Sequence, residues 1–355
     1  MRRPKLDPSF RIGRRCVGDG APVFVIAEIG VNHNGDAALA RKMIDAAARA
    51  GADCVKFQTF RAEEFMADRE MTYEYISAGR KVREKMFDMF KRLELPDRAY
   101  RALFAYARKR GVEPMTSAAD PLSLAVAVRA GAPALKLSSE DLINLPLVEL
   151  SARSRLPLIL STGMADAEEV QDALAILARR GVKRAVFLHC VSVYPTPDRE
   201  ANLNRILALR ALTAGPVGYS DHTLGVEACT AAVALGACVI EKHFTLDRGL
   251  PGPDQALSST PGEFAALVRA LRRVESMRGH AAVTPATAEA KSRRDFRRSL
   301  VAASDLPPGH RLSRADLLLK RPGTGLRARD AALIVGKRLR RAVAADKPVL
   351  PRDVR

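Results

Sequence analysis

The chain has 355 residues, of which 47% are hydrophobic and 28% charged. This composition excludes a disordered or fibrous protein, and the length suggests about two domains. The net charge of +18 is concentrated after residue 268, where 22 Lys and Arg stand against 8 Asp and Glu. This segment holds no RGG-type run and a single aromatic residue, Phe296, so a small anionic ligand is favoured over nucleic acid.

Short apolar runs alternate with helical patterns from residue 23 to about residue 278. The predicted strands are 23–28, 52–58, 112–116, 133–138, 157–161, 185–190, 216–220 and 237–244. Segments 36–51 and 166–181 repeat apolar residues at three- and four-residue steps and end on a glycine, as amphipathic helices do. Segment 61–111 is longer than one helix, and we expect it to carry two. Eight strand–helix units fit a (β/α)8 barrel better than a doubly wound sheet, and no glycine-rich dinucleotide motif follows any strand.

The pattern changes after Met277. Residues 279–298 are rich in Ala, Thr and Pro and then charged, which predicts a linker. Residues 299–355 contain the short β-like pieces 299–303, 317–322 and 347–350, separated by Pro-Gly and Lys-Pro turns, which predicts a small β-rich domain. Its few apolar residues suggest that it packs against the barrel or another subunit.

The cysteines and the N-terminus bear on where the protein resides. None of the five cysteines forms a CxxC pair, which argues against a disulfide framework and a cysteine zinc site. The basic N-terminus leads into no signal-peptide apolar segment, and no apolar run reaches the length of a membrane helix. We therefore expect a cytoplasmic protein without a membrane partner.

Catalytic groups of a (β/α)8 barrel stand at the carboxyl ends of its strands. Every predicted strand ends on polar residues, namely Glu28, Lys56, Gln58, Thr116, Lys136, Ser139, Ser161, Thr162, His189, Ser220, Asp221, His222, Glu241, Lys242 and His243. The alternative is that these residues are polar only because strand ends are exposed to solvent. That alternative explains one or two serines, but it does not explain well why charged residues follow fully apolar strands. Lysines from different strands, with hydroxyl donors, predict a site that holds a phosphate and a carboxylate together.

Two histidines at neighbouring strand ends suggest a metal site. His222 and His243 follow the seventh and eighth strands, so their imidazoles are expected to converge. Two histidines with water and substrate oxygens suit Mn²⁺ or Mg²⁺. A histidine that is merely hydrogen-bonded at the barrel rim is the alternative. We interpret Cys190, the cysteine nearest to this rim, as a packing residue.

Seven motifs together identify a family. They are FVIAEIGVNHNG (24–35), GADCVKFQTF (51–60), LILSTGM (158–164), LHCVSVYPTP (188–197), GYSDHTLG (218–225), EKHFTLDRGLPGPD (241–254) and LLKRPGTG (318–325). In these motifs the chain closely resembles the sialic acid (N-acetylneuraminate) synthase family of bacterial nonulosonate synthases. The resemblance implies a (β/α)8 TIM barrel over 1–278, a linker over 279–298 and an antifreeze-like (SAF) domain over 299–355.

The resemblance also implies a reaction. Members condense phosphoenolpyruvate with an N-acylated hexose such as N-acetylmannosamine, giving a nine-carbon 2-keto sugar acid and phosphate. It implies a divalent metal, Mn²⁺ or Mg²⁺, on His222 and His243, and a domain-swapped homodimer in which the SAF domain covers the partner's active site.

The family's site residues can be carried over position by position. Glu28 takes the position credited with handling the attacking water. The phosphoenolpyruvate positions are occupied by Lys56, Thr116, Lys136, Ser139, Ser192 and Ser220. The amino-sugar positions are occupied by Gln58, Asp141, Tyr194, Asp254 and Arg321.

Departures from the family pattern lie mainly on the sugar side. Segment KLSSED (136–141) places Glu140 where a glycine is usual, and MTSAAD (115–120) replaces a Ser-Thr-Pro-Phe turn. Position 192, often asparagine, is serine. The motifs therefore leave the identity of the sugar substrate undecided. The alternative to an N-acetylneuraminate synthase is a legionaminic, pseudaminic or spore-coat polysaccharide synthase. A synthase or aldolase for shorter keto-deoxy sugar acids, or a non-catalytic carbohydrate-binding barrel, fits the motifs less well.

Overall fold

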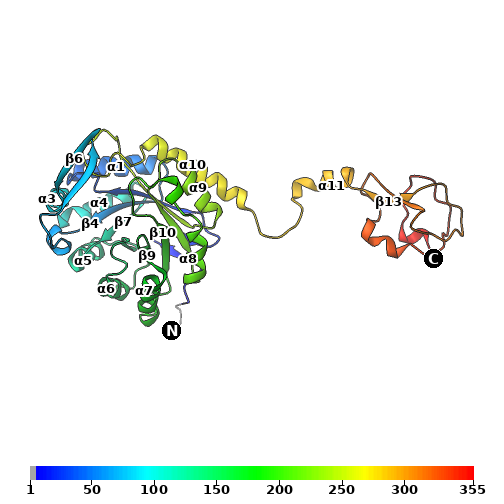
Figure 1. Cartoon of the computed structure of the whole chain (residues 1–355), viewed down its shortest axis with the longest axis horizontal. Coiled ribbons are helices and arrows are strands. Elements are labelled where there is room, and N and C mark those ends of the chain that lie inside the picture. Colours follow the sequence, from blue (N-terminus) through cyan, green and yellow to red (C-terminus); the bar gives the residue numbers. More distant parts are fainter. Residues whose placement is uncertain (1–4) are drawn as a thin grey trace. The chain divides into compact units, whose positions relative to one another are not determined.

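In the computed structural model, which describes residues 5–355, the chain forms two compact units, Met1–Gly279 and His280–Arg355 (Figure 1). No helix in this described range is both long and apolar enough to cross a membrane.

The first unit is a closed barrel of parallel strands, which confirms the predicted (β/α)8 fold. Its eight strands are β3 (Phe24–Gly30), β4 (Cys54–Thr59), β7 (Glu113–Ala118), β8 (Leu135–Leu137), β9 (Leu158–Ser161), β10 (Ala185–Cys190), β11 (Val217–Asp221) and β12 (Val239–His243). Strand β12 pairs with β3 and closes the ring. Each strand begins and ends within two residues of its predicted bounds.

Amphipathic helices cover the outside of the barrel (Figure 1). They are α1 (Ala37–Arg49), α4 (Asp97–Lys109), α5 (Pro121–Arg129), α6 (Leu145–Arg153), α7 (Ala167–Arg179), α8 (Arg205–Thr213), α9 (Glu227–Ala234) and α10 (Pro261–Arg278). Asp36 and Asp166 cap the two helices predicted most clearly, accepting hydrogen bonds from the first-turn amides. Gly51 and Gly181 follow these helices with φ of +90° and +66°, the left-handed conformation that favours glycine.

Alternation along the strands divides the core into two layers. One side of each strand packs against the helices, as Val25, Val55 and Phe57 do. The other side fills the barrel interior, where Ile26, Cys54, Met115 and Val239 cluster with residues of the hairpin formed by β1 (Ser9–Ile12) and β2 (Arg15–Gly18). Because successive side chains point to opposite faces, the inward positions nearest the carboxyl ends of the strands form the floor of the barrel mouth.

Segment 61–111 differs from the expectation of two helices. It contains α2 (Ala62–Phe65), a hairpin of β5 (Thr72–Ser77) and β6 (Arg80–Lys85), α3 (Met86–Leu93) and then α4. The hairpin residues TYEYIS and RKVREK alternate half-buried and exposed side chains with period two. Ala78 and Gly79 join them with φ of +48° and +74°, as a tight hairpin turn requires.

The second unit has a small core of its own. Strand β13 (Ser299–Ala302) pairs antiparallel with β14 (Leu317–Lys320). Nine buried apolar residues form the core, namely Leu300, Ala302, Leu306, Leu312, Ile334, Leu339, Val343, Val349 and Val354. The predicted piece 347–350 contributes only an isolated bridge, between Val301 and Pro348. The expected linker contains η2 (Thr287–Glu289) and α11 (Ala290–Phe296), and η3 (Ala328–Leu333) and η4 (Pro351–Asp353) complete the unit.

Candidate active site

A buried lysine lies between two glutamates at the floor of the barrel mouth. Lys56 Nζ lies 2.9 Å from Glu28 Oε2 and 3.7 Å from Glu241 Oε2, and it donates to Ser117 Oγ at 2.9 Å. Burial raises the pKa of Glu28 to about 7, since it outweighs the lowering effect of Lys56 and is reinforced by Glu241. A carboxyl group with a pKa near neutrality can take up or release a proton during a reaction at pH 7.

The second lysine stands among hydroxyl groups. Lys136 Nζ donates to Ser161 Oγ at 2.7 Å and to Leu137 O at 2.8 Å. Burial lowers its pKa, Glu241 opposes this, and Lys56 adds to the lowering. An anion between the two lysines would therefore gain from both charges.

A glycine leaves room between two serines beside this lysine. Gly163 N donates to Ser139 Oγ at 3.0 Å. A Cβ at position 163 would overlap Ser192 Oγ and lie 2.7 Å from Ser139 Oγ, so the backbone can approach these hydroxyls only because residue 163 is glycine. The arrangement offers hydroxyl and amide donors next to a cation, which suits a phosphate or carboxylate.

His222 and His243 converge, with ring centroids 5.5 Å apart. His222 Nδ1 lies 2.7 Å from Val191 O, and because a carbonyl only accepts, this nitrogen carries a proton and leaves Nε2 as the ring nitrogen that could bind a metal ion. Burial lowers the pKa of His222, but Cys190, the Val191 carbonyl and Glu241 together raise it above its usual value, so a metal ion at Nε2 would displace a proton. His243 Nδ1 is buried without a hydrogen-bond partner among the described residues and lies 3.5 Å from Asp254 Oδ2. Burial and His222 hold the pKa of His243 well below its usual range, so its imidazole is neutral.

These histidines fit a divalent metal ion. His243 is neutral and has a ring nitrogen without a hydrogen-bond partner among the described residues, and His222 is fixed through Nδ1 by a backbone carbonyl, as metal-ligating histidines usually are. Within residues 5–355 no three His, Cys, Asp or Glu side chains are grouped so as to hold a metal unaided. Water or substrate oxygens would therefore have to complete the coordination.

The residues predicted to hold the sugar lie next to this pair. A side chain at Gly30 would meet Glu28 Oε1, Gln58 Nε2 and Asp254 Oδ2 at 3.1, 3.2 and 3.6 Å, so these three groups converge on one point. Gln58 Nε2 donates to Glu28 Oε1 at 3.0 Å. The Tyr194 ring lies 4.0 Å from that of His222.

Two further predicted sugar residues have other surroundings. Asp141 is hydrogen-bonded by Ser138 Oγ, and burial raises its pKa to about 7. Arg321 belongs to the second unit, where its Nε donates to Phe296 O at 3.1 Å and its guanidinium lies 5.4 Å from the Phe296 ring centroid.

Thr116 does not point into the barrel, contrary to our expectation. Its hydroxyl lies 2.7 Å from that of Thr59 in the layer between barrel and helices. Strand β7 continues to Ala118 rather than ending at residue 116, and Ser117 pairs with the inward Gln58. Ser117 therefore occupies the inward position and contacts Lys56.

Sequence reasoning gave no role to several residues of the site. Glu241 and Ser161 stand at predicted strand ends without an assigned role, and Gly163 occurs only within the motif LILSTGM. Counting alternate positions from the apolar interior residues identifies Ser117, Ser161 and Glu241, because each follows an interior residue by two. Nothing in the sequence alone indicates that Gly163 lies between Ser139 and Ser192.

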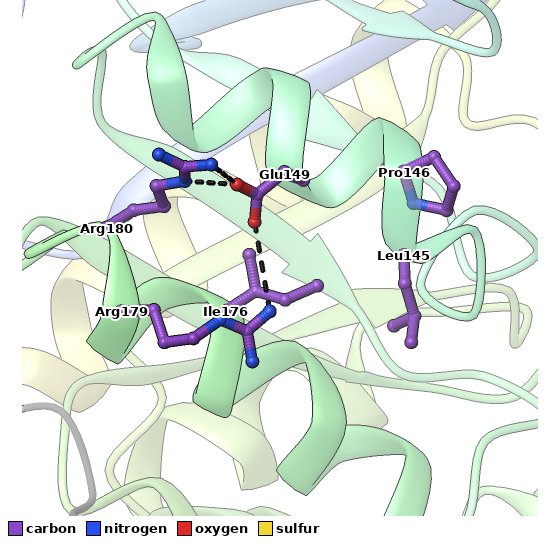
Figure 2. Close-up of a pocket in the computed structure, with 6 residues that line it drawn as sticks. All are labelled: Leu145, Pro146, Glu149, Ile176, Arg179 and Arg180. Atoms are coloured by element: carbon purple, nitrogen blue, oxygen red, sulfur yellow. Dashed lines mark hydrogen bonds and ion pairs between the residues drawn. The ribbon is translucent and has the colours of Figure 1, made fainter.

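A groove on the outer surface lies away from these residues. Figure 2 shows it between α6 and α7, lined by Leu145, Pro146, Glu149, Ile176, Arg179 and Arg180. Glu149 forms ion pairs with both arginines, so its charge is already matched within the groove. We assign no chemistry to it.

Comparisons with known proteins agree with the resemblance found in the sequence. The NeuB family model matches residues 43–282, and the SAF domain model matches residues 297–355. The chain is 39% identical to the N,N'-diacetyllegionaminic acid synthase of Legionella pneumophila, over 94% of this chain and 95% of that one. It is also 39% identical to the uncharacterized protein MJ1065 of Methanocaldococcus jannaschii, over 93% and 94% of the two chains. The crystal structure of the N-acetylneuraminic acid synthetase of Leptospira borgpetersenii superimposes with a TM-score of 0.74 at 35% identity, covering 80% of this chain and 94% of that one.

Proposed function

The chain belongs to the NeuB family, and from this premise we propose that it joins phosphoenolpyruvate to an N-acylated hexose, such as N-acetylmannosamine. The products would be a nine-carbon 2-keto sugar acid and phosphate. The observation that carries the proposal is the charge arrangement at the barrel mouth, where Lys56 and Lys136 adjoin Glu28 and the converging imidazoles.

In this reaction the lysines and hydroxyls would bind phosphoenolpyruvate. Lys56 and Lys136 would offset the charges of its phosphate and carboxylate, with Ser139, Ser192 and Ser220 as donors. Ser117 takes the place that we first expected Thr116 to fill, because its hydroxyl already contacts Lys56. Ser220 Oγ donates to Glu241 Oε1 at 2.9 Å, and a bound anion would compete for that proton.

Glu28 would handle the water. Bond formation between C3 of phosphoenolpyruvate and the sugar aldehyde leaves C2 electron-deficient, and water adds there. Glu28 Oε1 is held by Gln58, so the carboxyl is positioned to orient that water and receive its proton. Collapse of the resulting adduct breaks the bond between C2 and the bridging oxygen, which departs with phosphate. No covalent bond to the enzyme is needed.

His222 and His243 would hold a divalent ion, Mn²⁺ or Mg²⁺. Such an ion acts as a Lewis acid toward a carbonyl oxygen. Asp254 lies beside His243, and Gln58 and Tyr194 line the same region, so these side chains would orient the sugar toward the phosphoenolpyruvate site.

A diacetamido-trideoxyhexose is the second candidate sugar. The chain is 39% and 38% identical to two N,N'-diacetyllegionaminic acid synthases, but 33–34% identical to the N-acetylneuraminate-9-phosphate synthases of fly, mouse and human. Glu140 departs from the family pattern and adjoins Asp141 in the sequence. Its side chain would therefore influence which of these sugars is bound.

From the resemblance we also propose that the protein works as a homodimer in which the second unit of each chain serves the barrel of its partner. Arg321 would then donate to the N-acyl oxygen of the sugar. The excess positive charge after residue 268 would help to offset the anionic substrate and product.

The test is phosphate release with Mn²⁺, phosphoenolpyruvate and a panel of sugars. The panel includes N-acetylmannosamine, its phosphorylated form and diacetamido-trideoxyhexoses. We expect sugar-dependent release and a keto acid of matching mass. Glu28→Gln should lower the turnover rate by about 10²–10⁴-fold and alter the KM for phosphoenolpyruvate far less. Phosphate release that needs no sugar, or full turnover by Glu28→Gln, would contradict the proposal.

A further inference from the structure

Strand β11, which His222 follows, and strand β12, which ends at His243, are joined side by side at their ends. Ser220 pairs with Glu241, and Asp221 pairs with Lys242, in the parallel register of β11 and β12. Ser220 and Glu241 meet in the barrel interior. Because side chains alternate, Asp221 and Lys242 point to the opposite side, into the layer beneath α9.

There the two side chains form an ion pair that is almost fully buried. Lys242 Nζ contacts Asp221 Oδ2, with 4% and 0% of the respective side chains exposed. The same Nζ donates to Thr223 O at 2.8 Å. Lys242, the neighbour of His243 in sequence, therefore holds the residues on both sides of His222.

The carboxylate of Asp221 is saturated with donors. Its Oδ1 accepts from Thr223 N at 2.9 Å and from Thr223 Oγ1 at 2.8 Å. Its Oδ2 accepts from Lys242 and from Cys229 Sγ of α9, the latter at 3.0 Å. The end of β11 is thus tied to β12, to its own following turn and to the covering helix.

The energetics of buried ion pairs indicate what such an arrangement contributes. The cost of removing two charges from water offsets most of their attraction, so apolar residues of similar shape often give equal stability. Charge-assisted hydrogen bonds are nevertheless short and directional, and apolar contacts cannot reproduce that geometry. The pair therefore affects the position of the strand ends more than the stability of the barrel.

We propose that Lys242 and Asp221 are positioning residues that set the spacing of the His222 and His243 imidazoles for a divalent metal ion. This inference rests on the proposed metal-binding role of the two histidines. It goes beyond that role because neither Lys242 nor Asp221 points toward the substrates. Loss of the pair should loosen the two strand ends and weaken metal binding before any substrate is present.

The experiment is a titration of the full-length apoprotein with Mn²⁺, followed by calorimetry and by the EPR signal of free Mn²⁺. The variants are Asp221→Asn, Lys242→Met and Lys242→Arg, with His243→Ala as the negative reference. Asp53→Asn is the control, because the mostly buried Asp53 forms an ion pair with the partly exposed Arg272 at the other end of the barrel strands. Melting temperature is measured for every variant.

Loss of a group hydrogen-bonded to a metal ligand typically costs about 10–100-fold in metal affinity. Asp221 and Lys242 act on the imidazoles through the backbone, so we expect a loss of up to about 10-fold for Asp221→Asn and Lys242→Met. Lys242→Arg keeps the charge but not the shape, so it should fold and still bind Mn²⁺ more weakly than the wild type. Asp53→Asn should lower the melting temperature and leave the Mn²⁺ affinity unchanged.

The outcomes separate the two ideas. If the wild type binds one Mn²⁺, His243→Ala does not, and all folded variants at 221 and 242 bind as the wild type does, the positioning role is wrong and the metal site stands. If His243→Ala binds Mn²⁺ as well as the wild type, the metal site itself is wrong and the positioning role is lost with it. If Lys242→Met and Asp221→Asn do not fold, the Mn²⁺ affinity of Lys242→Arg is the test. A lower affinity than that of the wild type supports the positioning role, and an unchanged affinity contradicts it.

Discussion

Ser117 and Thr116 are adjacent hydroxyl residues on opposite faces of β7. Ser117→Ala removes a hydroxyl that contacts Lys56, so it should raise the KM for phosphoenolpyruvate. Thr116→Val removes a hydrogen bond to Thr59 outside the barrel, so it should cost about 1 kcal/mol of stability and leave that KM unchanged. Steady-state kinetics and denaturant unfolding on the same two proteins check both expectations. If Thr116→Val alone raises the KM for phosphoenolpyruvate, Thr116 rather than Ser117 binds this substrate, as the sequence indicated.

His33 should make the barrel sensitive to acid. It is fully buried, its Nδ1 accepts from Gly35 N at 3.0 Å, and burial lowers its pKa from 6.5 to about 4. The unfolded chain therefore binds a proton at this residue between pH 6.5 and pH 4 that the folded chain does not. The stabilisation is complete above pH 6.5 and is lost as the pH falls toward 4, by about 3 kcal/mol in total.

The matching variant is His33→Asn, whose Oδ1 can accept from the same amide without titrating. Its unfolding free energy should fall less between pH 7 and pH 4.5 than that of the wild type, when both are measured by denaturant titration. Carboxylates elsewhere contribute equally to both proteins and cancel in the comparison. Equal slopes in the two proteins would show that His33 is not the acid-sensitive group.

At the scale of elements, the barrel could be predicted because each strand is a short apolar run between amphipathic helices with clear caps. The hairpin β5–β6 could not, because its residues TYEYIS and RKVREK are mostly polar and sit in a segment long enough for helices. Packing against neighbouring residues favours a hairpin over a helix in this segment. Tyr73 and Tyr75 stack on each other and rest against the cluster of Val31, Phe60 and Met89, which only a strand with period two allows.

The residues of the site also divide into those that the sequence predicts and those that it does not. Those at strand ends could be found from the sequence, since alternation and strand order bring them to one rim. The face of Thr116 was misjudged because strand ends are uncertain by a residue or two, and a shift of one residue reverses the side chain. The bond of Lys242 to both neighbours of His222 depends on register and could not be foreseen.

The hairpin should contribute to sugar binding. Ser77 Oγ accepts from Gly252 N at 3.0 Å, which ties the hairpin to the loop that carries Asp254. Burial and then the charge of Asp254 raise the pKa of Tyr73, so its phenol lies within the field of that carboxylate. Tyr73→Ala should raise the KM for the sugar several-fold and leave the KM for phosphoenolpyruvate unchanged. Tyr75→Phe, which loses the hydroxyl that contacts Glu84 and Arg92 but keeps the ring, is the control. Equal effects of both variants on the KM for the sugar would show that the hairpin is not part of the sugar site.

At the scale of the whole molecule, the proposed dimer can be tested by mixing two inactive variants. One subunit carries Glu28→Gln in its barrel, and the other carries Arg321→Ala in its second unit. In a swapped heterodimer one site collects both substitutions and the other is intact, so up to about a quarter of wild-type activity should return. Each variant mixed with itself is the control. Proven subunit exchange with no regained activity would show that the second unit does not serve a partner's barrel.

The central claim concerns how the barrel mouth splits phosphoenolpyruvate, and isotopic labelling of the oxygen that bridges C2 and phosphorus tests it most directly. Water attack at C2, with Glu28 receiving the proton, leaves the labelled oxygen on phosphorus. We therefore predict that, with Mn²⁺ and the productive sugar, every phosphate released carries the label and equals the keto acid formed. Unlabelled phosphate would mean attack at phosphorus, and labelled phosphate without keto acid would mean simple breakdown; either result would contradict the account.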